Sequence, residues 1–323
     1  MRARNISVKE STGRTLSSAI LRADGKKLLA KGHVISEEDV RTLETAGLNE
    51  ISVTEPEGDE VGEDDAVLRV ASTIGRGALK VRLATGGKAN LVTAERCCVL
   101  VDDEVLKHIN SRPSMVVATS RNFTWAESGI PVAVVKSAPF AVAKTDLEAL
   151  LSLVEKRGPI VQAMPIRNPA VAILYTDQVN GERARRLLEN TMRRRLNRFG
   201  ISASETLASV EEEGAVTACL QHLLRAKPTA VLIASTTAPA GPDDVIGRAM
   251  VRAGCEIESF LAPVEPGGLL LLGYKDQVPI VCAPGSFRPA RRCAVDLLLP
   301  PLLAGYRVSK WDVACLGDGG LLV

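Results

Sequence analysis

The chain has 323 residues, of which 46% are hydrophobic and 24% charged, and its formal net charge is +2. This composition is that of a globular protein that can bury a sizeable core, and the length suits two or three domains. The near-neutral balance gives no general reason to expect nucleic acid or an anionic membrane as a partner.

The sequence shows no targeting signal, and together with the cysteine usage this predicts a cytoplasmic protein. The N-terminal sequence MRARNISVKE is polar and lacks the apolar core of a signal peptide. No apolar run approaches the roughly 20 residues that a helix needs to span a bilayer. The seven cysteines are odd in number, contain no CxxC pair and lie mostly in apolar runs, so we expect buried, reduced thiols.

Residues 1–60 are predicted to form a small α/β unit. Ser36 and Asp39 have the spacing of a capping box at a helix start, and Gly47 is placed to end that helix. The stretch from Glu55 to Asp65, EPEGDEVGEDD, is acidic and poor in apolar residues. We interpret it as a solvated linker, with a docking site for a basic partner as the alternative.

Residues 61–167 are predicted to form a strand-rich middle domain. In Leu79–Leu83 apolar residues alternate with lysine and arginine, as in a half-exposed strand. Thr145 and Glu148 open an amphipathic helix at capping-box spacing. We find no catalytic constellation in this part of the chain.

Residues 168–306 alternate between strands and helices, which predicts an α/β domain with a three-layer architecture and a mostly parallel sheet. Residues 307–323 show little periodicity and are expected to form a C-terminal tail. The elements expected in the α/β domain include strands at Val171–Tyr175 and Thr229–Ala234, a basic helix from Gly181 to Phe199, a helix from Pro242 to Gly254 and a final helix from about Phe287.

Two strand-to-helix loops of this domain are candidate anion sites. One loop carries Asp243 and Asp244, and the other is Pro284-Gly285-Ser286. Unpaired N–H groups and the dipole at a helix N-terminus both favour a negative charge. The second loop is followed by cations that would oppose the helix dipole unless an anion lies there; these are Arg288, Arg291 and Arg292. The alternative is a serine cap with solvated arginines.

Other polar residues are second-rank candidates. Thr176, Asp177 and Asn180 follow the first strand of the α/β domain, where a doubly wound sheet presents its ligand crevice. The predicted basic helix lacks interleaved aromatic residues, so a solvated or oligomer-facing surface is preferred to nucleic-acid binding. The arginines of that helix are Arg183, Arg185, Arg186, Arg193, Arg194, Arg195 and Arg198.

The last third of the chain resembles the molybdopterin-binding fold of the molybdenum cofactor adenylyltransferase and insertase families. The matching features are Asp244-Val245 after a strand and loop, Ala253-Gly254-Cys255-Glu256-Ile257, Val264-x-Pro266-Gly267 and the run from Pro279 to Gly285. A bacterial subgroup of such proteins is also similar in the N-terminal run from Lys31 to Asp39 and in the run from Pro131 to Val142.

The resemblance implies a molybdopterin site at the two loops. Ser286 with Pro284 and Gly285 would hold the terminal phosphate of molybdopterin, aided by Arg288 or Arg291. Asp244 would act as the catalytic carboxylate, holding Mg²⁺ or positioning nucleotide phosphates. The chain departs from the families at Thr236 and Thr237, which replace a glycine-rich turn and narrow the approach to the pterin.

Three functions therefore compete. The first is a protein that binds molybdopterin or the finished molybdenum cofactor for biosynthesis, storage or delivery to a molybdoenzyme. The second is a molybdopterin adenylyltransferase or molybdenum insertase that uses Asp244 and Mg²⁺. The third is a regulatory or scaffold protein whose N-terminal domains contact a molybdoenzyme or a cofactor-biosynthesis protein. The oligomeric state is open, with a homo-oligomer as one alternative.

Overall fold

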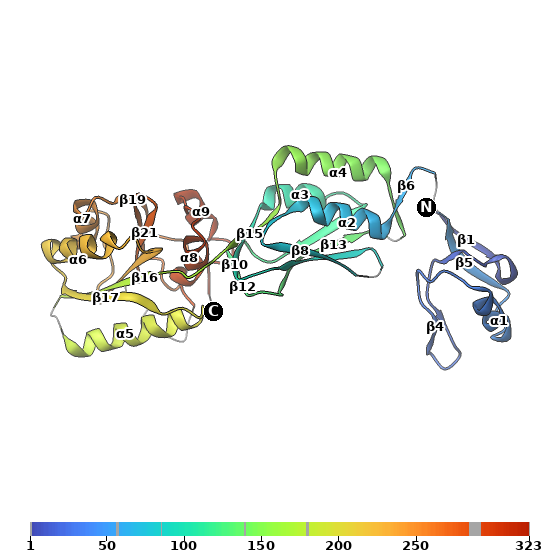
Figure 1. Ribbon diagram of the computed structural model, residues 1–323, viewed down its shortest axis with the longest axis horizontal. Coiled ribbons are helices and arrows are strands. Elements are labelled where there is room, and N and C mark those ends of the chain that lie inside the picture. The colour runs from blue at the N-terminus through green and yellow to red at the C-terminus, as the bar shows by residue number, and fades with distance from the viewer. Residues whose placement is uncertain are drawn as a thin grey trace. The chain divides into compact units, whose positions relative to one another are not determined.

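The computed structural model describes residues 2–55, 58–84, 86–138, 140–178, 181–283 and 292–322 (Figure 1). The chain divides into two compact units. The first unit comprises residues 1–94, 101–120 and 128–163, and the second comprises residues 95–100, 121–127 and 164–323. The four-segment division expected from the sequence stays a prediction at its boundaries.

The N-terminal part of the first unit is a three-stranded antiparallel sheet with one helix. The strand order is β1-β5-β2, and the core contains Leu16, Leu43 and Val53. The predicted helix boundaries are confirmed, because Ser36 and Asp39 form the capping box and Gly47 follows the helix at φ +78°. The elements are β1 Arg2–Ser7, η1 Val8–Glu10, β2 Thr15–Leu16, β3 Ile20–Leu21, β4 Lys27–Leu29, α1 Glu37–Thr45 and β5 Glu50–Glu55.

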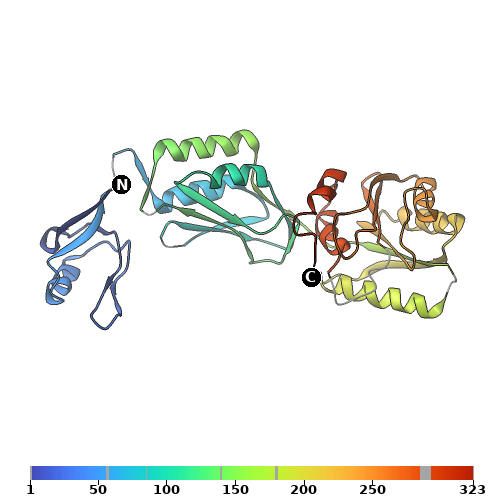
Figure 2. The same cartoon turned by 180° about the vertical axis from the view of Figure 1, so that it is seen from behind.

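The rest of the first unit is built on a four-stranded antiparallel sheet of order β11-β13-β9-β8. Helix α2 covers one face of this sheet with Val67, Val70 and Ala71, and α3 and α4 lie on the same side (Figures 1 and 2). The elements are β6 Glu60–Gly62, α2 Glu63–Ile74, β7 Gly75–Gly77, β8 Leu79–Ala84, β9 Lys88–Thr93, α3 Asp103–Asn110, β11 Met115–Thr119, β13 Pro131–Ser137, β14 Ala141–Ala143, α4 Lys144–Arg157 and β15 Val161–Pro165.

The second unit contains a six-stranded sheet of order β17-β16-β18-β21-β20-β19. The first four strands are parallel, and β20 and β19 run antiparallel to their neighbours. The elements are β10 Cys97–Val101, β12 Thr124–Ala126, β16 Val171–Asp177, α5 Glu182–Asn197, β17 Ala203–Val210, α6 Glu213–Arg225, β18 Ala230–Ser235, α7 Val245–Arg252, β19 Glu256–Phe260, β20 Leu271–Lys275, β21 Val278–Cys282, α8 Ala294–Leu303 and α9 Lys310–Cys315.

The two faces of this sheet are both buried, which confirms the expected three layers. Alternate residues of the central strands point to opposite faces, as the two-residue period of a strand requires. Ile173 and Leu232 pack with α5 and α8, whereas Leu174 and Ile233 pack with α6 and α7. Figure 1 shows α5 on one side of the sheet and α6 and α7 on the other.

Two predicted helix starts in the second unit are wrong, and one helix was not predicted. Helix α7 begins at Val245, because the Asp244 side chain caps it and Pro242 lies before the cap. Its last residue is Arg252, and the predicted Gly254 follows the C-cap residue Ala253 at φ +86°. Helix α8 begins at Ala294, because Cys293 and Asp296 form its capping box, so Arg292 precedes the helix instead of opening it. The expected tail contains α9, which Ser309 and Asp312 cap. No helix in the described ranges is long and apolar enough to cross a membrane.

Candidate functional site

The carboxyl ends of four parallel strands meet at one edge of the six-stranded sheet. The strand register places Thr176 beside Ser235, Asp177 beside Val210, and Ile233 beside Cys282. Ligands of open α/β sheets bind in the crevice outside such carboxyl ends. The structure therefore brings the predicted residues Thr176 and Asp177 to the same edge as the loop that carries Thr236 and Thr237.

Thr176 and Asp177 end the central strand β16 in buried positions. Their exposed fractions are 1% and 5%, and the Asp177 carboxylate accepts a hydrogen bond from Gly181 N at 3.1 Å. The Thr176 hydroxyl is buried and has no hydrogen-bond partner in the part of the chain that the structure describes. Leaving a buried hydroxyl unpaired costs free energy, and buried hydroxyls normally have a hydrogen-bond partner, so this hydroxyl is a candidate contact for a bound ligand.

Glu211 organises the loop after β18. Its two carboxylate oxygens accept hydrogen bonds from the hydroxyls of Ser235 and Thr237. Thr237 N also donates to Ser235 Oγ at 3.0 Å. Thr237 is therefore fixed by side-chain bonds rather than by a glycine-rich turn. Sequence reasoning missed Glu211 and Ser235, although each ends or directly follows a strand whose carboxyl end could be placed at this edge.

Asp244 is the N-cap of α7. One carboxylate oxygen accepts from Gly247 N and the other from Ala240 N, both at 2.8 Å. The loop packs tightly there, because a Cβ at Gly247 would lie 1.9 Å from Pro242 O. Both Asp244 oxygens thus serve the local backbone. The catalytic and metal-binding roles expected for this residue remain predictions.

The electrostatic character of the described edge is acidic. Burial raises the pKa of the Cys282 thiol, and the nearby carboxylates of Asp244 and Glu211 raise it further. Neither of these two carboxylates has a lysine, arginine or histidine within ion-pairing distance among the described residues. An acidic edge lined by hydroxyls suits ligand N–H and O–H donors rather than bare phosphate oxygens.

The predicted phosphate loop lies outside the described residues. Arg292 is described and is exposed just before Cys293, the N-cap of α8. Helix α8 starts three residues after Arg291 and does not include the predicted arginines. The site predictions that fall outside the description are Pro284, Gly285, Ser286, Arg288, Arg291 and Asn180.

The described residues do not fit a magnesium site. They contain no group of three or more histidine, cysteine, aspartate or glutamate side chains arranged to hold a metal ion. Mg²⁺ requires near-octahedral oxygen coordination, which Asp244 alone cannot supply, and both Asp244 oxygens also hold backbone N–H groups of the loop and of α7. Asp244 therefore acts in this structure as a helix cap and loop anchor.

The basic helix α5 is only partly solvated. Arg185 and Arg186 pair with Glu189 and Glu182 on its exposed face. Arg195 is 3% exposed and bonds to Asp296 and Cys293 of the α8 capping box. The interpretation of all its arginines as a solvated or oligomer-facing surface is therefore wrong for Arg195, whose charge is buried against Asp296.

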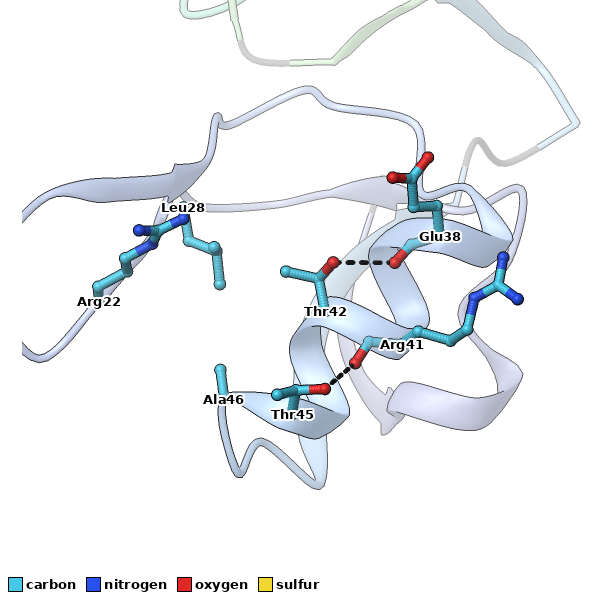
Figure 3. A pocket seen from close by; sticks show the side chains of 7 residues that line it. All are labelled: Arg22, Leu28, Glu38, Arg41, Thr42, Thr45 and Ala46. Atoms are coloured by element: carbon cyan, nitrogen blue, oxygen red, sulfur yellow. Dashed lines mark hydrogen bonds between the residues drawn. The ribbon is translucent and has the colours of Figure 1, made fainter.

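A surface hollow of about 390 Å³ lies in the N-terminal part of the first unit (Figure 3). Thr42 and Thr45 line it, but their hydroxyls already donate to carbonyls one turn earlier, at 3.0 and 2.7 Å. These two hydroxyls are therefore already used within the helix, and the polar groups left to meet a ligand there are charged side chains. The other residues that line the hollow are Arg22, Leu28, Glu38, Arg41 and Ala46.

Comparisons with known proteins give limited matches. A family described as "Domain of unknown function (DUF8806)" matches residues 5–55. A search of curated proteins finds no match. Among solved structures, a molybdopterin biosynthesis MoeA protein from Pyrococcus horikosii aligns with 94% of this chain and 75% of its own, at 10% identity and a TM-score of 0.33.

Two further solved structures align at similar levels. A molybdopterin biosynthesis Mog protein from Mycobacterium ulcerans covers 42% of this chain and 94% of its own, at 15% identity and a TM-score of 0.31. A molybdenum cofactor biosynthesis protein from Pyrococcus furiosus covers 96% of this chain and 66% of its own, at 12% identity and a TM-score of 0.21. Such scores are too low to carry a functional argument, which must come from the residues.

Proposed function

We propose that this protein binds molybdopterin or the molybdenum cofactor at the carboxyl edge of its six-stranded sheet. The observation that carries the proposal is the Thr176 hydroxyl, which is buried at this edge without a partner. A ligand in the crevice would supply the missing hydrogen bond. The sequence resemblance between the run around Asp244 and the molybdopterin-binding families supports the choice of ligand.

The chemistry of the edge suits the pterin end of that ligand. A pterin ring carries amino and ring N–H donors, and a carboxylate is an acceptor for such donors. Glu211 and Asp177 lie at the ends of the two neighbouring strands β17 and β16. The terminal phosphate would lie at the Pro284-Gly285-Ser286 loop, where we expect Arg288 or Arg291 to neutralise it.

Binding is favoured over catalysis. Adenylyl transfer would need Asp244 to hold a metal ion or the nucleotide phosphates, and both its oxygens accept backbone N–H groups. Thr236 and Thr237 stand where the enzymatic families have glycines, and Thr237 is tied to Glu211. We place the protein in cofactor biosynthesis, storage or delivery, with a molybdoenzyme or a biosynthetic protein as the receiving partner.

A fluorescence titration of the full chain with molybdopterin under anaerobic conditions tests the proposal. We expect saturable binding with a micromolar or lower Kd, weakened by Thr176→Val and by Glu211→Gln. Arg69→Gln, an exposed change on α2 of the first unit, serves as the control and should bind like the parent protein. Absence of binding at micromolar protein, or equal affinity in all variants, would show that this edge is not the site.

A further inference from the structure

Strand β8 leaves the four-stranded sheet of the first unit open along one edge. It pairs with β9 over its full length, from Leu79 opposite Thr93 to Ala84 opposite Lys88, without a bulge. Within the described part of the chain, no strand pairs with its other side. An edge strand of this kind presents a row of backbone N–H and C=O groups to which another chain can add.

The opposite edge of the same sheet is closed by a side chain. Asn110, at the end of α3, donates from Nδ2 to Val117 O at 2.8 Å and accepts from Val117 N at 2.7 Å. The amide of Asn110 therefore occupies the middle of β11 in the way that a neighbouring strand would. Strand addition is possible at β8 and is blocked at the centre of β11.

The side chains of β8 alternate between cations and apolar groups. Lys80 and Arg82 are exposed on the face away from α2, whereas Val81 and Leu83 point to the helix-covered face. Leu83 is 49% exposed at the rim of that face. An incoming strand with alternating acidic and apolar residues would match both rows, because side chains of neighbouring strands lie side by side on each face.

The cationic character extends across the open face. The register places Lys88 of β9 directly opposite Lys136 of β13, a like-charged pair that is destabilising in isolation. None of the four cations Lys80, Arg82, Lys88 and Lys136 has a carboxylate within ion-pairing distance among the described residues. The face is thus complementary to an acidic partner in charge.

We propose that β8 is a docking strand for an extended acidic segment of a partner protein, with acidic and apolar residues in alternation. A polypeptide fits better than a nucleic acid, because the four strands of this sheet carry no aromatic residue on which a base could stack. Lysines on an edge strand can also serve only to prevent aggregation. That explanation leaves the Lys88–Lys136 pair, on two inner strands, without a cause.

The probe is a fluorescein-labelled octapeptide EVEVEVEV, titrated with the full chain and followed by fluorescence anisotropy. We expect saturable binding that weakens with salt, and a loss of about tenfold or more in the double variant Lys80→Glu/Arg82→Glu. The control Arg69→Glu/Lys156→Glu changes the net charge of the same unit equally at two exposed sites away from β8, and it should bind like the parent. Thermal unfolding of each variant checks that the fold is intact.

A proline-containing peptide separates strand addition from simple charge attraction. The peptide EVEPEVEV keeps all four carboxylates but removes one backbone N–H, and we expect it to bind much more weakly. Equal binding of the two peptides, or an unchanged affinity in Lys80→Glu/Arg82→Glu, would overturn the proposal. Tighter binding of a single-stranded oligonucleotide at the same residues, or self-association that the double variant abolishes, would also overturn it in favour of those occupants.

Discussion

Arg195 of helix α5 and Asp296 of helix α8 form an ion pair in which each side chain is 3% exposed. Asp296 also accepts a hydrogen bond from Cys293 N at 2.8 Å, so the pair fixes the start of α8. One oxygen of Asp296 has no hydrogen-bond partner in the described part of the chain. A buried carboxylate that is already incompletely paired depends strongly on its hydrogen-bonded cation, here Arg195, since the second cation, Arg198, lies 3.8 Å away and is 34% exposed.

Replacing Arg195 should therefore destabilise the second unit severely. We expect Arg195→Met to lower the free energy of unfolding by about 3–5 kcal/mol, because it leaves the buried Asp296 charge with only the longer contact to the partly exposed Arg198, at 3.8 Å, as a counter-ion. The double variant Arg195→Met/Asp296→Asn removes both charges and should recover part of that loss. Denaturant unfolding measures all three proteins. A loss in Arg195→Met no larger than in the exposed neighbour Arg194→Met would contradict the prediction.

The unpaired Thr176 hydroxyl gives a second prediction. Valine has nearly the same shape, so Thr176→Val removes the unsatisfied polar group without opening a cavity. We expect the ligand-free protein to gain up to about 1 kcal/mol in stability and to bind molybdopterin less tightly. Differential scanning fluorimetry with and without ligand measures both effects. A stability loss without any change in affinity would mean that the hydroxyl has a structural role.

Glu211 should control the loop after β18. We expect Glu211→Ala to free Ser235 and Thr237, to speed amide hydrogen exchange across residues 235–238 and to cost about 1.5–3 kcal/mol for each hydrogen bond to the charged group. Glu212→Ala, at the neighbouring exposed position, is the matched control. Hydrogen exchange followed by mass spectrometry makes the comparison. Unchanged exchange in the loop would rule out this organising role.

Much of the fold could be predicted because it follows from local rules. Alternating strands and helices, with the central strands apolar throughout, determine a covered parallel sheet, and the spacing of Ser36 and Asp39 determines the first helix start. The predicted helix starts were wrong where a capping side chain sets a later first residue, as Asp244 does for α7 and Asp296 for α8. The burial of Arg195 was not predictable, because its partner lies 101 positions away in the sequence. Glu211 could be placed at the sheet edge, because it directly follows β17, but its bonds to Ser235 and Thr237, at the end of β18 and in the loop after it, could not be predicted.

The carboxyl of Asp39 links the start of helix α1 to pH. The pKa of Asp39 is lowered from 3.8 to about 2, first by the hydrogen bond with His33 and then by bonds from the Ser36 backbone and hydroxyl. His33 Nε2 lies 2.7 Å from Asp39 Oδ2, and Ser36 N lies 2.8 Å from the same oxygen. A carboxyl whose pKa is lower in the folded state stabilises the fold above its unfolded pKa, and this contribution disappears as the pH falls through its folded pKa.

The start of helix α1 should therefore weaken between about pH 4 and pH 2. In this window we expect the protection of the Glu37–Thr45 amides against hydrogen exchange, corrected for intrinsic rates, to fall in the parent protein. Asp39→Asn keeps an acceptor for the Ser36 N–H but cannot titrate, so it should show a smaller dependence and, at pH 6, a stability loss of about 1 kcal/mol or less. Parallel pH profiles in the two proteins would show that Asp39 is not the titrating group.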